Sequence, residues 1–355
     1  MDDSLNIPNG RAAVKVSIID STRMRLPCSH LLTPDIPRHQ YLDLPSLSFL
    51  IEHPGSQRKI LFDLGLRKEL SSHPPAVQKF LVDSGWDLQV TKDIPEILKE
   101  GNLSPTDIEA VVFSHHHFDH IGDLSQFPST TEVVVGPGFR NAYLPGWPVN
   151  HESSLIDDDW KNHNVREESF DVGPESLSIG GFPAVDYFGD GSFFLLNAPG
   201  HTIGHLTALA RISLASTSSR EHPRDKFVLL GGDICHYPGV FRPTNRSPLD
   251  AEAQAALYTC PASFFLDVHP EKTCEKPYYK MPAQCTVDQK AAEESIRKLC
   301  AFDANEDVLV IIGHDASLIG KMDFFPKTIN VWEREAKATL QWAFLKDLCQ
   351  NTIDN

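Results

Sequence analysis

The sequence lacks several features that would assign it to a broad class at once. Its seven cysteines include no CxxC pair, which argues against a thiolate metal site or a dithiol redox motif. No stretch is apolar enough to span a membrane, and residues 1–4 offer neither the basic nor the apolar region of a secretory signal. We therefore expect a soluble, cytoplasmic protein with reduced thiols and no membrane partner.

Basic residues are also scarce. The chain has 32 Lys and Arg against 48 Asp and Glu, a formal net charge of −16, and contains no basic run. Such a surface repels polyphosphates, so we expect no nucleic-acid partner and favour a small-molecule substrate of little charge. The 41% content of hydrophobic residues is that of a globular protein. Composition leaves the oligomeric state open.

The pattern of apolar runs indicates an α/β protein. Strands are expected at 13–19, 47–51, 59–62, 110–113, 132–135, 193–197, 227–230 and 308–312. Helices are expected at 94–100, 249–257, 287–299 and 331–348. Strands that alternate with helices in this way are typical of α/β folds.

Two long segments depart from this alternation. Residues 139–172 form an irregular polar stretch with Trp147 and Trp160, and residues 238–285 combine a helix with aromatic residues such as Phe264 and Tyr278. We interpret both as lid-like insertions within one domain that spans residues 1–355. We expect them to roof the substrate pocket.

Four residues of metal-binding type fall within six positions directly after the strand at 110–113. They are His115, His117, Asp119 and His120. A turn with this spacing can direct two imidazoles to one metal ion, and a carboxylate and a third imidazole to another. These donors suit zinc, and iron or manganese can also take them. His116 lies between two ligands and is expected to point away from the metal.

Three later strands are each followed by another residue of metal-binding type. His201 follows the strand at 193–197, Asp233 follows 227–230, and His314 follows 308–312. Ligands in α/β proteins lie beyond the carboxyl ends of strands. We therefore expect these three side chains to join the histidine cluster.

The whole pattern resembles the metallo-β-lactamase superfamily, from about residue 16 to residue 314. The resemblance implies an αββα sandwich of two mixed β-sheets flanked by helices. It also implies two Zn²⁺ ions, with Asp233 as the bridging ligand. One ion would be held by His115, His117 and His201, and the other by Asp119, His120 and His314.

Local motifs are similar to the N-acyl-homoserine lactonase-like group and its fungal lactonase and lactamase members. These motifs are PGHTIGH at residues 199–205 and GHD at residues 313–315. Where those lactonases have a catalytic tyrosine, this chain has His236, with Tyr237 next to it. We expect either of them to donate to the substrate oxygen or leaving group. Asp63, His205 and Asp315 are expected to orient the ligand imidazoles.

The resemblance implies a detoxifying hydrolase that opens a cyclic ester or amide by attack of a metal-bound hydroxide. Lactones, lactams and cyclic carbamates, including benzoxazolinone-type plant compounds, are the candidates, with Asp119 and Asp233 as catalytic residues. The main alternative is a thioesterase, like glyoxalase II or like enzymes that release polyketides from a carrier protein. A non-catalytic binding member and a mononuclear iron dioxygenase that uses the first three ligands are further alternatives.

Overall fold

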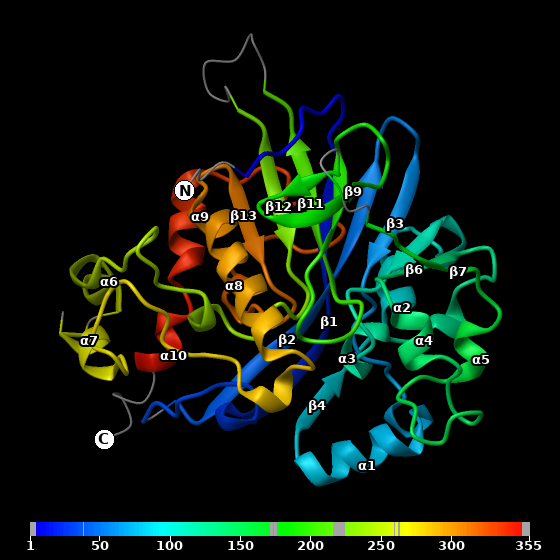
Figure 1. Ribbon diagram of the computed structural model, residues 1–355, viewed down its shortest axis with the longest axis horizontal. Helices are drawn as coiled ribbons and strands as arrows, with labels where there is room; N and C mark the ends of the chain where they lie inside the picture. The colour runs from blue at the N-terminus through cyan, green and yellow to red at the C-terminus, as the bar shows by residue number, and fades with distance from the viewer. Residues whose placement is uncertain are drawn as a thin grey trace.

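A computed structural model describes most of the chain. The residues described are 5–37, 39–170, 173, 176–215, 224–258, 260–261 and 263–349. Two β-sheets lie at the centre, and helices flank their outer faces (Figure 1). The predicted αββα sandwich is therefore confirmed. Within the described residues, we find no helix with both the length and the apolar character needed to cross a membrane.

The first sheet has seven strands in the order β4-β1-β2-β3-β5-β6-β7. Their bounds are β1 Lys15–Pro27, β2 Tyr41–His53, β3 Arg58–Phe62, β4 Asp87–Val90, β5 Ala110–Val112, β6 Glu132–Val135 and β7 Val165–Glu167. The pairs β3–β5, β5–β6 and β6–β7 are parallel, and the remaining pairs are antiparallel. β1 and β2 are longer than predicted because their far halves alternate charged residues such as Arg25 and Asp43 with buried leucines.

The second sheet has six strands in the order β13-β12-β11-β10-β9-β8. Their bounds are β8 Ser178–Ile179, β9 Phe182–Asp186, β10 Phe193–Asn197, β11 Leu206–Ser213, β12 Lys226–Leu230 and β13 Val308–Ile311. Only β12 and β13 are parallel to each other. Both sheets are therefore mixed, as expected.

Alternation along the central strands builds the two sides of each sheet. In β12, Val228 and Leu230 belong to the apolar cluster between the sheets, whereas Phe227 and Leu229 belong to the cluster on the outer face. This division follows from the two-residue period of a strand. The fully apolar runs in the sequence are thus strands that are buried on both faces.

The flanking helices cover the outer faces of the two sheets. α2 (Ile94–Glu100), α4 (Phe139–Tyr143) and α5 (Asp157–Trp160) contribute apolar residues to the cluster on the first sheet. α8 (Gln289–Ala304) packs on the second sheet, while α6 (Ala251–Tyr258) and α7 (Phe264–Val268) lie farther out (Figure 1). Residues 139–172 are less irregular than predicted, because β7 within this segment pairs with β6. Residues 171–172 lie outside the described part of the chain.

The single C-terminal helix predicted at 331–348 is wrong. The chain instead forms α9 (Arg334–Gln341) and α10 (Leu345–Cys349). Between them, Trp342 and Phe344 are both buried in the same apolar cluster. Two residues that lie two positions apart point to different sides of a helix, so burying both in one cluster requires the chain to leave the helical path.

Candidate metal centre

The histidine motif lies where β5 ends and the short helix α3 (Phe118–Ile121) begins. Asp63 shapes this turn from the end of β3. Its carboxylate accepts hydrogen bonds from the Ser114 backbone N and hydroxyl, both at 2.7 Å, and from His120 Nδ1 at 2.9 Å. His120 Nε2 is therefore left to face the centre. Asp63 thus lies where it can orient His120, as the sequence predicted.

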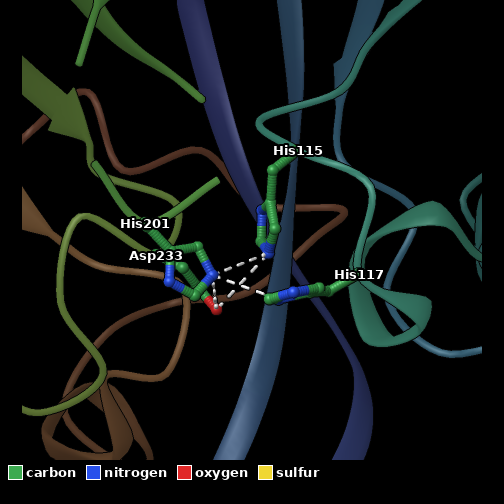
Figure 2. Close-up of side chains that lie close together, drawn as sticks. All are labelled: His115, His117, His201 and Asp233. Atoms are coloured by element: carbon green, nitrogen blue, oxygen red, sulfur yellow. Dashed lines mark hydrogen bonds and ion pairs between the residues drawn. The ribbon is translucent and has the colours of Figure 1, made fainter. Parts of the chain in front are cut away.

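The ligand-type side chains come together in two groups. The first group is His115, His117, His201 and Asp233, and the second is Asp119, His120 and His314. Within each group, the candidate ligand atoms all lie within 4.8 Å of one another. Figure 2 shows the first group converging from separate segments of the chain, with His201 Nε2 3.3 Å from His115 Nε2 and 3.1 Å from His117 Nδ1.

Asp233 lies between the two groups and directs one carboxylate oxygen mainly toward each. Its Oδ2 is 3.6 Å from Nε2 of both His115 and His201 in the first group. Its Oδ1 is 3.1 Å from Nε2 of both His120 and His314 in the second. A carboxylate with this arrangement can bridge two cations.

Further hydrogen bonds orient the other members of the two groups. His201 Nδ1 donates to the Cys285 carbonyl at 2.8 Å, and His314 Nδ1 donates to the Pro45 carbonyl at 2.7 Å. His205 Nε2 accepts from the Asp233 backbone N at 3.0 Å. Backbone carbonyls from distant parts of the chain therefore orient these imidazoles, a role that sequence reasoning assigned to side chains. No local motif indicates these carbonyls.

Asp315 corrects one of these assignments. Its carboxylate caps the turn that follows, accepting from the Ser317 backbone N at 3.0 Å and from the Ser317 hydroxyl. None of its hydrogen bonds reaches a ligand imidazole among the described residues. Asp315 therefore stabilises the loop after His314 and does not orient the ring of that ligand.

The electrostatics of the two groups differ. Burial, together with the neighbouring imidazole of His120, lowers the pKa of His115 well below its usual range. Burial acts in the same direction on His120, but the carboxylates of Asp233 and Asp119 outweigh it and raise the pKa of that imidazole. Burial would raise the pKa of Asp233, yet the surrounding imidazoles lower it strongly. The bridging carboxylate is therefore held ionised.

Two buried atoms at the centre test whether these residues suit metal ions. His120 Nε2 and Asp233 Oδ1 form no hydrogen bond that satisfies them, although both are shielded from solvent. An unsatisfied buried imidazole nitrogen beside an unsatisfied carboxylate oxygen is costly in a metal-free protein. Divalent cations bind this donor set, so the residues fit a metal centre.

His236 and Tyr237 have different surroundings. His236 borders the cavity over the two groups, and its Nε2 is 3.3 Å from Asp233 Oδ2. Tyr237 turns away from the cavity, and its hydroxyl donates to the Phe344 carbonyl at 3.0 Å and to Asp347 Oδ2 at 3.1 Å. This placement corrects the expectation that Tyr237 can donate to substrate, because the bulk of the second sheet's outer cluster surrounds its ring.

The two groups form the floor of a cavity of about 670 Å³. We define the floor as His117, Asp119, His201, Asp233, His236 and His314. We define the apolar wall as Met24, Leu31, Val77, Phe80, Trp86 and Phe118. A cavity of this size can enclose a small organic molecule.

Sequence reasoning missed the wall. Its centre is α1 (Pro75–Ser84), which begins at the second of two prolines, together with Trp86 beyond its end. The predicted insertions contribute only Ser154, Gln284 and Cys285 to the cavity lining. A signal for the helix was present, because two prolines followed by an amphipathic run that includes Phe80 indicate the start of a helix with an apolar face.

Comparison with known proteins supports this interpretation of the fold. A model of the metallo-beta-lactamase superfamily matches residues 78–207. The chain is 36% identical to Gamma-lactamase FDB1 of Fusarium pseudograminearum, over 96% of this chain and 84% of that relative. It is 39% identical to Metallo-hydrolase mfmC of Annulohypoxylon moriforme, over 97% of this chain and 90% of that relative.

A solved structure shares the fold. It is a mutant of AiiA from B. thuringiensis with N-decanoyl-L-homoserine bound at its active site. The TM-score is 0.59 at 19% identity, and the match covers 90% of this chain and 100% of that one. The chain therefore belongs to the metallo-beta-lactamase superfamily. Within that superfamily it is a metallo-hydrolase, which confirms the expected class of enzyme.

Proposed function

We propose that the protein opens a cyclic ester or amide, that is, a lactone, lactam or cyclic carbamate, with two zinc ions at its centre. The observation that carries this proposal is the position of Asp233, which faces both ligand groups on the floor of one cavity. Relatives that cover nearly the whole chain are named gamma-lactamase and metallo-hydrolase. A cavity with a polar floor and an apolar wall suits such small, weakly charged substrates.

The donor set decides which residues would hold the metal. His115, His117 and His201 would hold one ion and Asp119, His120 and His314 the other, with Asp233 between them. Zinc is the best match to imidazole and carboxylate donors, while iron and manganese also accept them. When bound, such ions polarise a carbonyl oxygen and make water acidic near neutral pH.

The chain's own residues then orient the reactants. Asp119 is a buried carboxylate that borders the cavity, with Oδ2 3.5 Å from His314 Nε2, and it is placed to accept a proton from water. Asp233 keeps the two ligand groups at a constant separation. His236 is placed to donate a hydrogen bond to the substrate carbonyl or to the leaving group, the role first shared with Tyr237.

The wall supports a substrate with a flat apolar part. Phe118 borders both the floor and the wall, and its ring centroid lies 5.8 Å from that of Phe80 and 6.3 Å from that of Trp86. Such clusters of rings bind aromatic and aliphatic groups with little loss of conformational entropy. A benzoxazolinone-type compound, whose cyclic carbamate is fused to an aromatic ring, meets both the floor and the wall.

The test is a substrate panel on metal-free protein reloaded with Zn²⁺. The panel contains simple lactones, γ-lactams, benzoxazolinone and thioesters, with Asp119→Ala as the matched inactive variant. We expect ring opening of at least one cyclic substrate, lost on chelation and in Asp119→Ala, and restored to the wild type by Zn²⁺. Turnover of thioesters alone would show that the proposed substrate class is wrong.

A further inference from the structure

The three histidines of the first ligand group come from two loops that belong to different sheets. His115 and His117 follow β5 of the first sheet, whereas His201 follows β10 of the second. At their bases, the loops share one backbone hydrogen bond, from Leu206 N to the Ser114 carbonyl at 2.8 Å. This bond does not reach the tips, where the imidazoles converge.

Tyr143, at the end of α4, contacts both tips. Its ring stacks on His116, with centroids 3.7 Å apart and an angle of 12° between the planes. Its hydroxyl oxygen accepts a hydrogen bond from the Ile203 backbone N at 3.2 Å. His116 lies between two ligands and Ile203 lies two residues after the third, so one side chain joins the two loops.

Neighbouring contacts hold Tyr143 in this position. The buried ring of Phe139, one turn earlier in α4, packs edge-on against Tyr143, with centroids 5.1 Å apart. The loop before α4 also lies directly on the loop that carries His201, since a Cβ at Gly136 would come within 2.1 Å of the Gly204 carbonyl oxygen. The close approach permitted by this glycine brings α4 to the ligand loops.

We propose that Tyr143 is a positioning residue for the first ligand group. It joins the loop of His115 and His117 to the loop of His201 and so sets their convergence. Tyr143 does not border the cavity, so it acts on the ligands and not on the substrate. The second ligand group has no member on the 201–203 loop, so Tyr143 contacts only one of its loops, the turn that carries Asp119 and His120, and should affect it less than the first group. This inference rests on the proposed metal centre.

The test measures metal affinity at each ligand group by Co²⁺ titration of metal-free protein, read from the visible absorption of bound Co²⁺. The Asp119→Ala background reports the first group alone, and the His201→Ala background reports the second. Into each we place Tyr143→Phe, which removes only the hydroxyl, and Tyr143→Leu, which also removes the stacked ring. Tyr258→Phe is the control, because it removes a hydroxyl that donates to the Trp342 carbonyl at 3.2 Å, away from the centre.

We expect Tyr143→Leu to weaken Co²⁺ binding at the first group by about 10–100-fold, the usual effect of removing a residue that orients ligands. Tyr143→Phe should weaken it by about threefold, since it keeps the stacked ring and loses one neutral hydrogen bond. The second group should lose less affinity than the first in both variants, and Tyr258→Phe should change neither group. Thermal unfolding in excess chelator checks that each variant is folded.

Unchanged affinity at the first group, or an equal loss at both groups, would overturn the role of Tyr143. If Tyr143→Leu does not fold, the same comparison with Tyr143→Phe decides the question. Failure of the wild type to bind two Co²⁺ ions would overturn the metal centre itself, a result distinct from failure of the tyrosine contact.

Discussion

The floor and the wall of the cavity are built in different ways. The floor consists of imidazoles and carboxylates, and hydrogen bonds to distant backbone carbonyls orient two of its imidazoles, those of His201 and His314. The wall consists of apolar side chains held mainly by packing, with one side-chain hydrogen bond, from Trp86 Nε1 to His30 Nδ1 at 2.8 Å, and Phe80 in it remains 44% exposed. Directional contacts restrict the geometry of polar side chains more than packing restricts apolar ones. We therefore expect the chemistry to depend on the floor and the choice of substrate to depend on the wall.

The largest effect should come from the residue that joins both halves of the floor. Asp233→Asn keeps the shape of the side chain and removes the charge that faces both ligand groups. We expect turnover to fall on the order of 10³-fold or more, with loss of bound metal. Steady-state kinetics and elemental analysis measure the two effects. Glu109→Gln, which changes a carboxylate on the surface, is the control, and equal activity of Asp233→Asn and wild type would contradict the role of the floor.

The next effect is a pH dependence of stability that comes from Asp347, which lies behind the floor. Burial raises the pKa of Asp347, the hydrogen-bond acceptor of Tyr237, to about 6. Because the folded-state pKa is raised, the carboxyl costs nothing below about pH 4. Its ionisation destabilises the fold as the pH rises through 6, by about 3 kcal/mol in total.

We compare the free energy of unfolding of metal-free Asp347→Asn and wild type, measured with urea. The difference between them should change in favour of the variant by this amount between about pH 4 and pH 7.5. A constant difference between the two proteins over that range would show that Asp347 has an ordinary pKa. Asp83→Asn, which removes an exposed carboxylate at the end of α1, is the matched control.

A smaller effect is expected from Asp63, which orients one imidazole of the second ligand group. Asp63→Asn leaves the Ser114 contacts possible but removes the charged acceptor of His120 Nδ1. We expect the affinity of the second ligand group for metal to fall by about 10–100-fold. Chelator competition measures it, and an unchanged second group with a weakened first group would be the contrary result.

The smallest effect should come from the wall. Trp86→Ala removes an aromatic surface and leaves the floor intact, so KM should rise about tenfold for an aromatic substrate while kcat and metal content change little. Val82→Ala on α1, where the side chain is 80% exposed and does not border the cavity, is the matched control. A fall in kcat with KM unchanged would mean that wall and floor are not separable.

The candidate ligand positions could be proposed from local sequence. His115, His117, Asp119 and His120 share one turn, and His201, Asp233 and His314 each lie in the loop that follows an apolar strand. The wall could not be predicted in this way, because local sequence signals the helix α1 but not its place over the cavity, which follows from packing on residues such as Phe118. The break at Trp342–Phe344 was missed for the same reason, since its cause is a cluster formed by distant residues.

The sequence alone determined the apolar strands and the ligand-type residues that follow them, since strand periodicity and the spacing of the histidine motif are local properties. The sandwich and the division of the ligands into two sets were implied by the resemblance to the metallo-β-lactamase superfamily. Only the tertiary structure decided which way each neighbour points. His236 points to the cavity, whereas Tyr237 points to α10. Asp315 caps a turn. His201 and His314 donate hydrogen bonds to the carbonyls of Cys285 and Pro45. Contacts between residues far apart in the chain have no pattern in the sequence, because their geometry exists only once both sheets have packed together.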